Sequence, residues 1–166
     1  MFRGDCNQQI NDMVRLIPQR ALTLAFLDPT GLHLHFDCVA KLARCGRVDL
    51  LILFPDRIDI IRNEKLYFEQ DESNLDRFMG AGSNWREERD SGVLSGSSSV
   101  SKFYVTCYKR QLETLGYKYS DDIPIRDRSR NQLLYRLVYA TKHQRGLDFW
   151  RKSLRKQLSG QLDLFD

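Results

Sequence analysis

The chain has 166 residues, of which 42% are hydrophobic and 29% charged, so it is long and apolar enough to form a packed core and is not a disordered polymer. Its net charge of +4 at pH 7 permits an acidic partner such as nucleic acid but does not by itself indicate one. The four cysteines form no C-x-x-C pair and lack zinc-finger spacing. The sequence shows no signal peptide and no apolar run near the ~20 residues that span a bilayer, which predicts a reduced, cytoplasmic protein.

The first half of the chain alternates helix and strand. The predicted elements are a helix capped by Asp5 or Asn7 and ended by Pro18, a strand over 21–27, a helix over 32–45 and a strand over 48–54. In the first strand, Leu22, Leu24, Phe26 and Leu27 are expected to be buried. The second strand is apolar on both faces, as parallel strands usually are. This order predicts an α/β fold with parallel, right-handed crossovers.

The second half is less regular and then returns to helix and strand. It is expected to begin with a helical turn over 58–68, a short helix over 73–80 and a flexible Gly- and Ser-rich loop at about 90–100. A long helix over 101–117, ended by Gly116, is expected next. Strands over 121–127 and 131–142 and an amphipathic helix over 146–158 complete the chain. The two strands are expected to pair antiparallel across the short segment between them.

Asp28 and Pro29 follow the first strand directly. Ligands bind at the carboxyl ends of parallel strands, so a carboxylate here can face a cleft, and Pro55 lies at the same end of the next strand. Alternatively, Asp28 caps the next helix or holds a turn. Its position in the sequence leaves both interpretations open.

Two other candidate sites have ordinary alternatives. His33, His35 and Asp37 would share a face and could bind a metal if they lay on a strand, but on the predicted helix residues two apart do not face each other. No metal site is therefore expected. The basic stretch 142–156, which contains Trp150, could grip phosphates, with help from Arg126, Arg128 and Arg130 on the hairpin. The alternative is a solvated helix face with the tryptophan in the core.

Motifs spread over nearly the whole chain occur in a characteristic order. They are Gly4-Asp5-Cys6-Asn7; Asp28-Pro29-Thr30-Gly31-Leu32; Asp49-Leu50-Leu51 with Phe54-Pro55; Arg62, Gly80 and Trp85; and Tyr135, Leu137, Tyr139, Ala140, Thr141 and Lys142, followed by Gly146 and Trp150. As an ordered set they resemble the three-Cys-motif partner (TcmP) family, which in turn is similar to the Rossmann-type methyltransferases that use S-adenosylmethionine. The resemblance implies one partial domain over 1–166, the C-terminal part of a Rossmann-like sheet with parallel strands flanked by helices and an antiparallel final strand pair.

The resemblance also implies an activity, methylation of an amine that could belong to a nucleic-acid base. In amine-methylating members, the Asp side chain and the Pro carbonyl of a D-P-P-aromatic turn accept hydrogen bonds from the amine and so aim its lone pair at the methyl group. The residues implied for this chain are Asp28 and Pro29 in catalysis, Asp5 and Asn7 in binding S-adenosylmethionine, and Thr30, Pro55 and Arg62 in binding the substrate.

The sequence departs from the family pattern in two places. Thr30 replaces the aromatic residue that would stack on the base, and the family's D-x-F-[AS]-G-x-G turn, which cradles the cofactor, has no counterpart. By comparison with the family, three strands are expected to be missing before the Gly-Asp turn, which would expose the sheet edge beside 21–27. The expected explanations are a separate chain carrying the missing half, a second copy paired at that edge, or an incomplete gene product. The family name implies a three-Cys-motif protein as a further partner. The alternative function is a catalytically inactive interaction module that needs a partner chain to complete its sheet.

Overall fold

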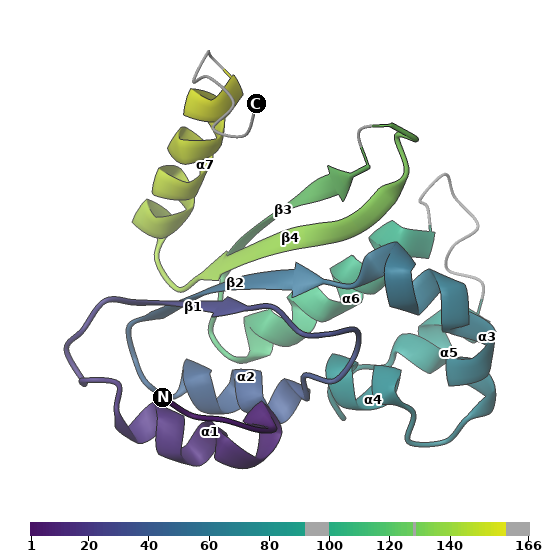
Figure 1. The fold of residues 1–166 in the computed structure, drawn as a ribbon, viewed down its shortest axis with the longest axis horizontal. Helices are drawn as coiled ribbons and strands as arrows, with labels where there is room; N and C mark the ends of the chain where they lie inside the picture. The colour runs from purple at the N-terminus through teal and green to yellow at the C-terminus, as the bar shows by residue number, and fades with distance from the viewer. Residues whose placement is uncertain (92–99, 128, 159–166) are drawn as a thin grey trace.

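A computed structural model describes residues 1–91, 100–127 and 129–158. It contains a four-stranded sheet in the order β1-β2-β4-β3, flanked by helices (Figure 1). The strands are β1 (Thr23–Leu27), β2 (Val48–Phe54), β3 (Tyr119–Arg126) and β4 (Leu133–Thr141). β1 and β2 are parallel, whereas β4 is antiparallel to both of its neighbours. The predicted α/β class and the antiparallel final strand pair are therefore confirmed.

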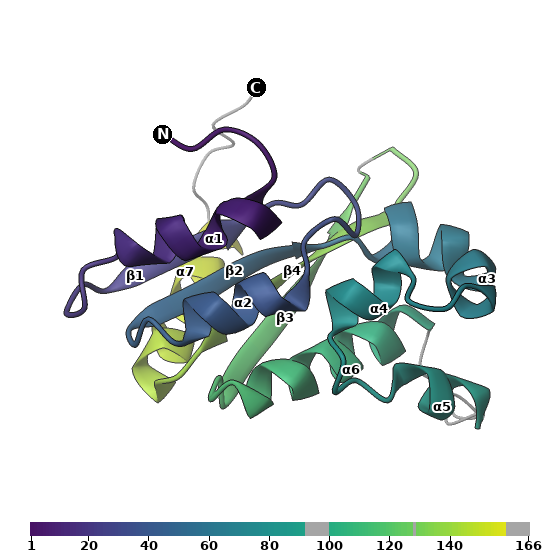
Figure 2. The same cartoon turned by 90° about the horizontal axis from the view of Figure 1, so that it is seen from below.

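The helices lie on both faces of the sheet. They are α1 (Cys6–Arg15), α2 (Phe36–Ala43), the π-helix η1 (Asp56–Ile61), α3 (Arg62–Glu69), α4 (Asn74–Met79), α5 (Trp85–Asp90), α6 (Val100–Thr114) and α7 (Gln144–Leu158). We call the face covered by α2, α4 and α6 the inner face, with α1 beside α2, and the face that carries α7 the outer face (Figures 1 and 2). No helix in the described ranges combines the length and apolar character needed to cross a membrane.

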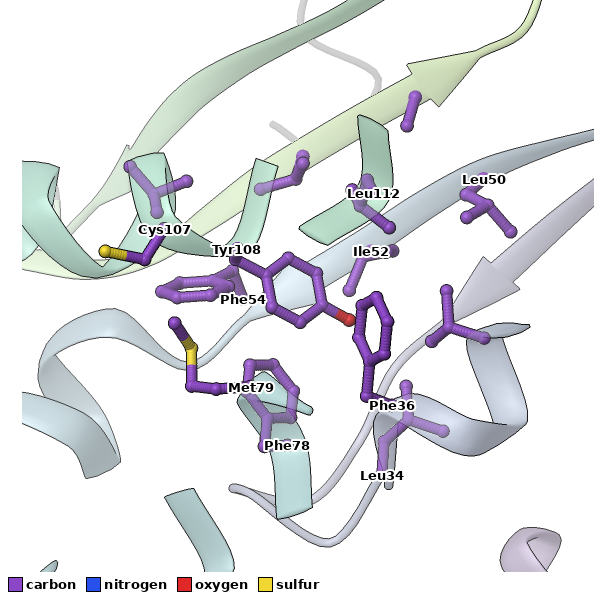
Figure 3. Close-up of a cluster of buried hydrophobic side chains, with 14 of the residues drawn as sticks. Leu34, Phe36, Leu50, Ile52, Phe54, Phe78, Met79, Cys107, Tyr108 and Leu112 are labelled. Atoms are coloured by element: carbon purple, nitrogen blue, oxygen red, sulfur yellow. The ribbon is translucent and has the colours of Figure 1, made fainter. Parts of the chain in front are cut away.

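The core lies between the inner face and its helices. Alternate residues of β2 point into it, and Leu50, Ile52 and Phe54 are fully buried. Tyr108 of α6 stacks on Phe78 of α4 with ring centroids 4.9 Å apart and meets Phe54 edge-on at 5.4 Å (Figure 3). Each such aromatic pair contributes about 0.5–1.5 kcal/mol beyond the burial of its area. This cluster joins the central strand to the helices beneath it.

A buried ion network ties the sheet to α6. Arg136 of β4 donates from Nε to Asp56 Oδ2 at 2.8 Å and from Nη1 to Asp122 Oδ2 at 2.7 Å. Ser101 donates to the same oxygen of Asp56, and Lys109 donates to Asp122. Burial alone would raise the pKa of Asp122, but the hydrogen bonds and charges of Lys109 and Arg136 outweigh burial and lower it. The network fixes the end of β2 against β3 and β4.

A second ion network joins α4 to α5. Ser73 and Asp76 form a capping box at the start of α4. Asp76 also accepts from Trp85 Nε1 at 3.0 Å and from Arg86 Nη2 at 2.6 Å. The Arg86 guanidinium also donates hydrogen bonds to the carbonyls of Tyr67, Phe68 and Gln70. One side chain therefore joins the end of α3 to α4 and α5.

The predicted elements differ from the structure mainly at their ends. α1 ends at Arg15, and the backbone N–H groups of Leu16 and Ile17 donate to carbonyls in the last turn of the helix. Pro18, the predicted end, therefore lies beyond the helix. The predicted helix over 32–45 begins only at Phe36, after an irregular stretch. Most of the predicted flexible loop, residues 92–99, and Arg128 lie outside the described residues.

Candidate functional site

The loop that follows β1 presents Asp28 and Thr30 to solvent at the carboxyl end of the sheet. In the described part of the chain, neither side chain has a hydrogen bond or an ion pair. Asp28 does not cap α2, because the N-cap residue of that helix is His35 and no side chain caps it. The structure therefore places Asp28 where a strand-end ligand would lie, and gives it no role in the fold.

Asp59 of η1 holds this loop in place. Its Oδ2 accepts from the N–H of Leu32 at 3.1 Å, and its Oδ1 accepts from Asn63 at 2.9 Å and from the Tyr67 hydroxyl at 2.5 Å. Burial and the hydrogen bond to Asp59 raise the pKa of Tyr67 to about 12, so this hydroxyl stays a donor. At Gly31, where φ is +69°, an added Cβ would lie 2.5 Å from Asp59 Oδ2, so the close approach requires glycine.

Sequence reasoning gave Asp59 no role at this loop. The signal was the spacing of Asp59, Asn63 and Tyr67, which are four residues apart and share one helical face.

Asp5 and Asn7, the residues expected to bind the cofactor, lie beside the same loop. The Asn7 side chain donates to the His33 carbonyl at 2.7 Å and accepts from the His35 N–H at 2.9 Å. Asp5 caps α1, and its Oδ1 accepts from both the backbone and the side chain of Asn7 at 2.9 Å. The structure thus brings both residues to the end of the sheet where Asp28 lies, and uses Asn7 to attach α1 to the loop.

The expected substrate residues Pro55 and Arg62 have different surroundings. Pro55 is buried, and its carbonyl accepts the Ile60 N–H at 3.2 Å, so it starts η1 and does not face solvent. Arg62 is exposed and lines a groove of about 380 Å³ whose apolar walls include Ile58 and Leu133. Of the two, Arg62 is placed to meet a ligand.

The described residues do not form a cradle for S-adenosylmethionine by themselves. β1 is followed by the Asp28-Pro29 loop, and β2 is followed by the buried Pro55. Neither connection is a glycine-rich turn that leads into a helix. One oxygen of Asp5 is already used to cap α1. The described ranges also contain no group of three or more His, Cys, Asp or Glu side chains placed to hold a metal.

The outer side of β1 is open. Leu22, Leu24 and Phe26, which we call the β1 strip, have 86%, 58% and 58% of their surface exposed. The expectation that they are buried is wrong for the described structure, because in it β1 has only β2 as a strand neighbour and no helix covers this part of the outer face (Figure 1). Alternation along a strand places all three side chains on the same face.

A groove of about 840 Å³ continues the β1 strip toward α7. Leu22, which directly precedes β1, and Leu24 of β1 line one side of it, and Phe149 of α7, which is 69% exposed, lines the other. Arg47 and Arg145 are basic residues of its lining. The open apolar surface therefore extends from the sheet edge to the base of α7.

Two neighbouring residues of α7 contact the sheet. Trp150 stacks on Tyr139 with ring centroids 5.0 Å apart and an interplanar angle of 11°, while Arg151 pairs with Asp121 at 3.2 Å. Trp150 is thus engaged in packing on the outer face and is half-buried, whereas the alternative of a solvated basic helix face expected it in the core.

Searches against models of protein families, against curated proteins and against solved structures found no match.

Proposed function

We propose that this chain is an interaction module of methyltransferase-like, Rossmann-type fold, whose sheet is completed by a further strand added along β1. The observation that carries this proposal is the β1 strip, three large apolar side chains on an edge strand with more than half of their surface exposed. Contiguous exposed apolar surface on an edge strand marks either an interaction site or an aggregation hazard.

The energetics favour a covering strand. Cross-strand contacts between large apolar side chains contribute roughly 0.2–1 kcal/mol per pair, and an added strand also pairs the backbone groups of the open edge. Thr23 donates its N–H to Arg47 beside β2 at 3.0 Å. Because the N–H and C=O groups of successive residues point to opposite edges of a strand, those of Leu22, Leu24 and Phe26 face the open edge.

The resemblance to the TcmP family points the same way, because it implies further strands on the far side of this edge. Chains that could supply them include a separate polypeptide carrying the missing half, a second copy, or the three-Cys-motif protein that the family name implies.

Hydrogen exchange tests the proposal directly. The chain is purified under mild conditions, so that any bound partner stays attached. Amide hydrogen exchange is then followed in a peptide covering 20–28, and a peptide covering 48–54 serves as the internal control. We expect slow exchange of 20–28 in the assembled state and faster exchange after dilution, while central β2 stays protected in both. Fast exchange of 20–28 in both states would contradict the proposal.

A second candidate function is the presentation of an amine for methylation, possible only with a cofactor cradle supplied by another chain. It is favoured by the free carboxylate of Asp28 at the strand end, in a loop held by Asp59. In the assembled state, calorimetric binding of S-adenosylmethionine and methyl transfer that is lost in Asp28→Asn would support it. Asp12→Asn, an exposed carboxylate on α1, is the control that should keep both. Absence of binding by the assembled protein would leave only the interaction module.

A further inference from the structure

We propose that the strand added along β1 is β1 of a second copy of this chain, antiparallel and related by a twofold axis at Leu24. This inference rests on the proposed function and specifies its partner. Three features of the strand support it independently: the direction of the backbone groups, the pattern of side chains, and the charges at the two ends.

The backbone N–H and C=O groups on the open edge of β1 can pair with the same groups of a second copy. In an antiparallel ladder centred on Leu24, Leu24 lies opposite Leu24 of the second copy, and Leu22 lies opposite Phe26 of the second copy. These are the residues whose N–H and C=O groups face away from β2. Every outward group of one strand therefore meets an outward group of the other, as an interface with twofold symmetry requires.

The side chains match as well. The same register brings the two β1 strips together on one face of a continuous sheet, with the Cβ atoms of opposite residues about 4.5–5.5 Å apart. Large apolar side chains that are more than half exposed in one copy then contact each other. The groove toward α7 lies on the same face, so Phe149 of each copy flanks the joined strips.

The charges at the ends of the strand select this register. Arg20 and Asp28 are both exposed, and neither has an ion pair in the described part of the chain. Asp28 follows β1 directly, whereas Arg20 lies in the turn before it, where the Ala21 N–H donates to the Pro18 carbonyl at 3.0 Å. Both are four residues from Leu24 along the chain, so pairing centred there brings Arg20 toward Asp28 of the second copy, twice. Moving the axis by one residue places Arg20 opposite Phe26, or Asp28 opposite Leu22, and loses both ion pairs.

Pairing would also affect the candidate catalytic carboxylate. Asp28, which is free in the single chain, would be held by Arg20 of the second copy. If Asp28 presents an amine, as in the second candidate function, the paired form would be catalytically silent. A parallel strand from a different polypeptide, as the family resemblance implies, would leave Asp28 free.

The first part of the experiment is the molar mass of the full chain by light scattering during size exclusion. We expect about twice the 19.5 kDa of one chain. Leu24→Lys places two ammonium groups opposite each other at the axis and should reduce the mass to that of one chain. The matched control is Leu16→Lys, which is 70% exposed at the end of α1 and should keep the doubled mass. Far-ultraviolet circular dichroism checks that all variants fold.

The second part is a charge exchange across the axis, measured as the dimer dissociation constant. Arg20→Asp alone and Asp28→Arg alone should each weaken the dimer about tenfold, because each replaces two attractive pairs by two repulsive ones. The double variant restores both pairs with the signs reversed, so its dissociation constant should return to within about threefold of the original. A variant that merely disturbed the loop would not be rescued in this way.

The outcomes separate this inference from the proposed function. A dimer that survives Leu24→Lys, or single charge variants that the double variant does not rescue, overturns the inference. A chain of single mass whose 20–28 peptide is nevertheless protected in its native assembly overturns the second copy and keeps the proposed function, with a different chain on β1. A chain of single mass with 20–28 unprotected in every state overturns both.

Discussion

The inner face of the sheet and its outer face at β1 use the same kinds of side chain, yet one is closed and the other open. Leu50 and Ile52 of β2 are fully buried under α2, α4 and α6, whereas Leu24 and Phe26 of the neighbouring strand are 58% exposed. The difference shows that an apolar pattern along a strand indicates which side chains must be covered. It does not indicate whether this chain supplies the covering element.

The polar groups differ in the same way. On the closed side, Asp56 and Arg136 form a nearly fully buried pair at 2.8 Å. Beside the open strand, Arg20 and Asp28 are exposed and have no ion pair within the described ranges. Charges on the covered side are thus used to hold the fold together, and charges along β1 remain available to another molecule.

The largest expected effect is on the closed side. Phe54→Ala should lower the free energy of unfolding by about 3–5 kcal/mol, because it leaves a cavity against Phe78 and Tyr108. Phe26→Ala, the same change on the open side, should stay within about 0.5 kcal/mol. Urea denaturation of both in the Leu24→Lys background, where no dimer contributes, makes the comparison. Equal losses would mean that the β1 strip is covered within the chain.

The buried ion pair comes next. Arg136→Met should cost roughly 3 kcal/mol, since it leaves the fully buried Asp56 without its charge partner. Asp56→Asn added to Arg136→Met should recover part of this loss, because the amide carries no charge to desolvate. Urea denaturation of the single and double variants gives the coupling free energy. A double variant less stable than Arg136→Met alone would contradict the assignment.

Asp76 should make stability depend on acid pH. Burial raises the pKa of Asp76, but the hydrogen bonds from Arg86 and Ser73 outweigh burial and lower it below its usual range. The native carboxyl then binds protons less readily than the unfolded one, so its contribution is complete above the unfolded pKa of about 3.9 and is lost as pH falls through the folded pKa.

The measurement is urea denaturation from about pH 6 to about pH 2.5. Asp76→Asn should lose about 1–2 kcal/mol at neutral pH and show a shallower acid loss than the unmodified chain. Asp122 and Asp127, whose pKa values are also lowered, contribute to the acid loss that remains. An unchanged acid slope in Asp76→Asn would show that this carboxyl does not contribute.

The loop at the carboxyl end of β1 gives a smaller effect. Gly31→Ala should cost about 1–2 kcal/mol, because it combines a left-handed backbone with a Cβ placed against Asp59. Gly82→Ala is the control, since its nearest neighbour is the flexible end of the Gln111 side chain at 3.3 Å. Urea denaturation measures both, and equal losses would mean that Asp59 does not constrain the loop.

The sequence was informative where local pattern decides structure. The strand over 48–54 was predicted at the residues that form β2, and Gly116, with φ +91°, follows the end of α6 as expected. The position of β4 between β2 and β3 was not predicted, because it depends on pairing between residues about 90 positions apart, such as Leu50 and Ala140.

The candidate site was harder to predict than the fold. Asp28 was identified from its place after a strand, but the residue that fixes its loop, Asp59, acts on Leu32 across 27 positions. Exposure of Phe26 could not be read from a strand pattern that is equally suitable for a core. Both omissions have one cause, since a side chain's partners are set by tertiary contacts and not by its neighbours in sequence.

The smallest expected effect on stability is the most informative about Asp28. Asp28→Asn should change the free energy of unfolding by less than about 0.5 kcal/mol, because its carboxylate has no partner among the described residues. Asp59→Asn, a carboxylate on the neighbouring element, should cost about 1 kcal/mol or more, because the amide cannot accept from Leu32, Asn63 and Tyr67 together. Both are measured by urea denaturation in the Leu24→Lys background. If Asp28→Asn costs as much as Asp59→Asn, Asp28 serves the fold as a turn residue. If it costs nothing, the fold does not need this charge, and the carboxylate stays available to Arg20 of a second copy or to an amine.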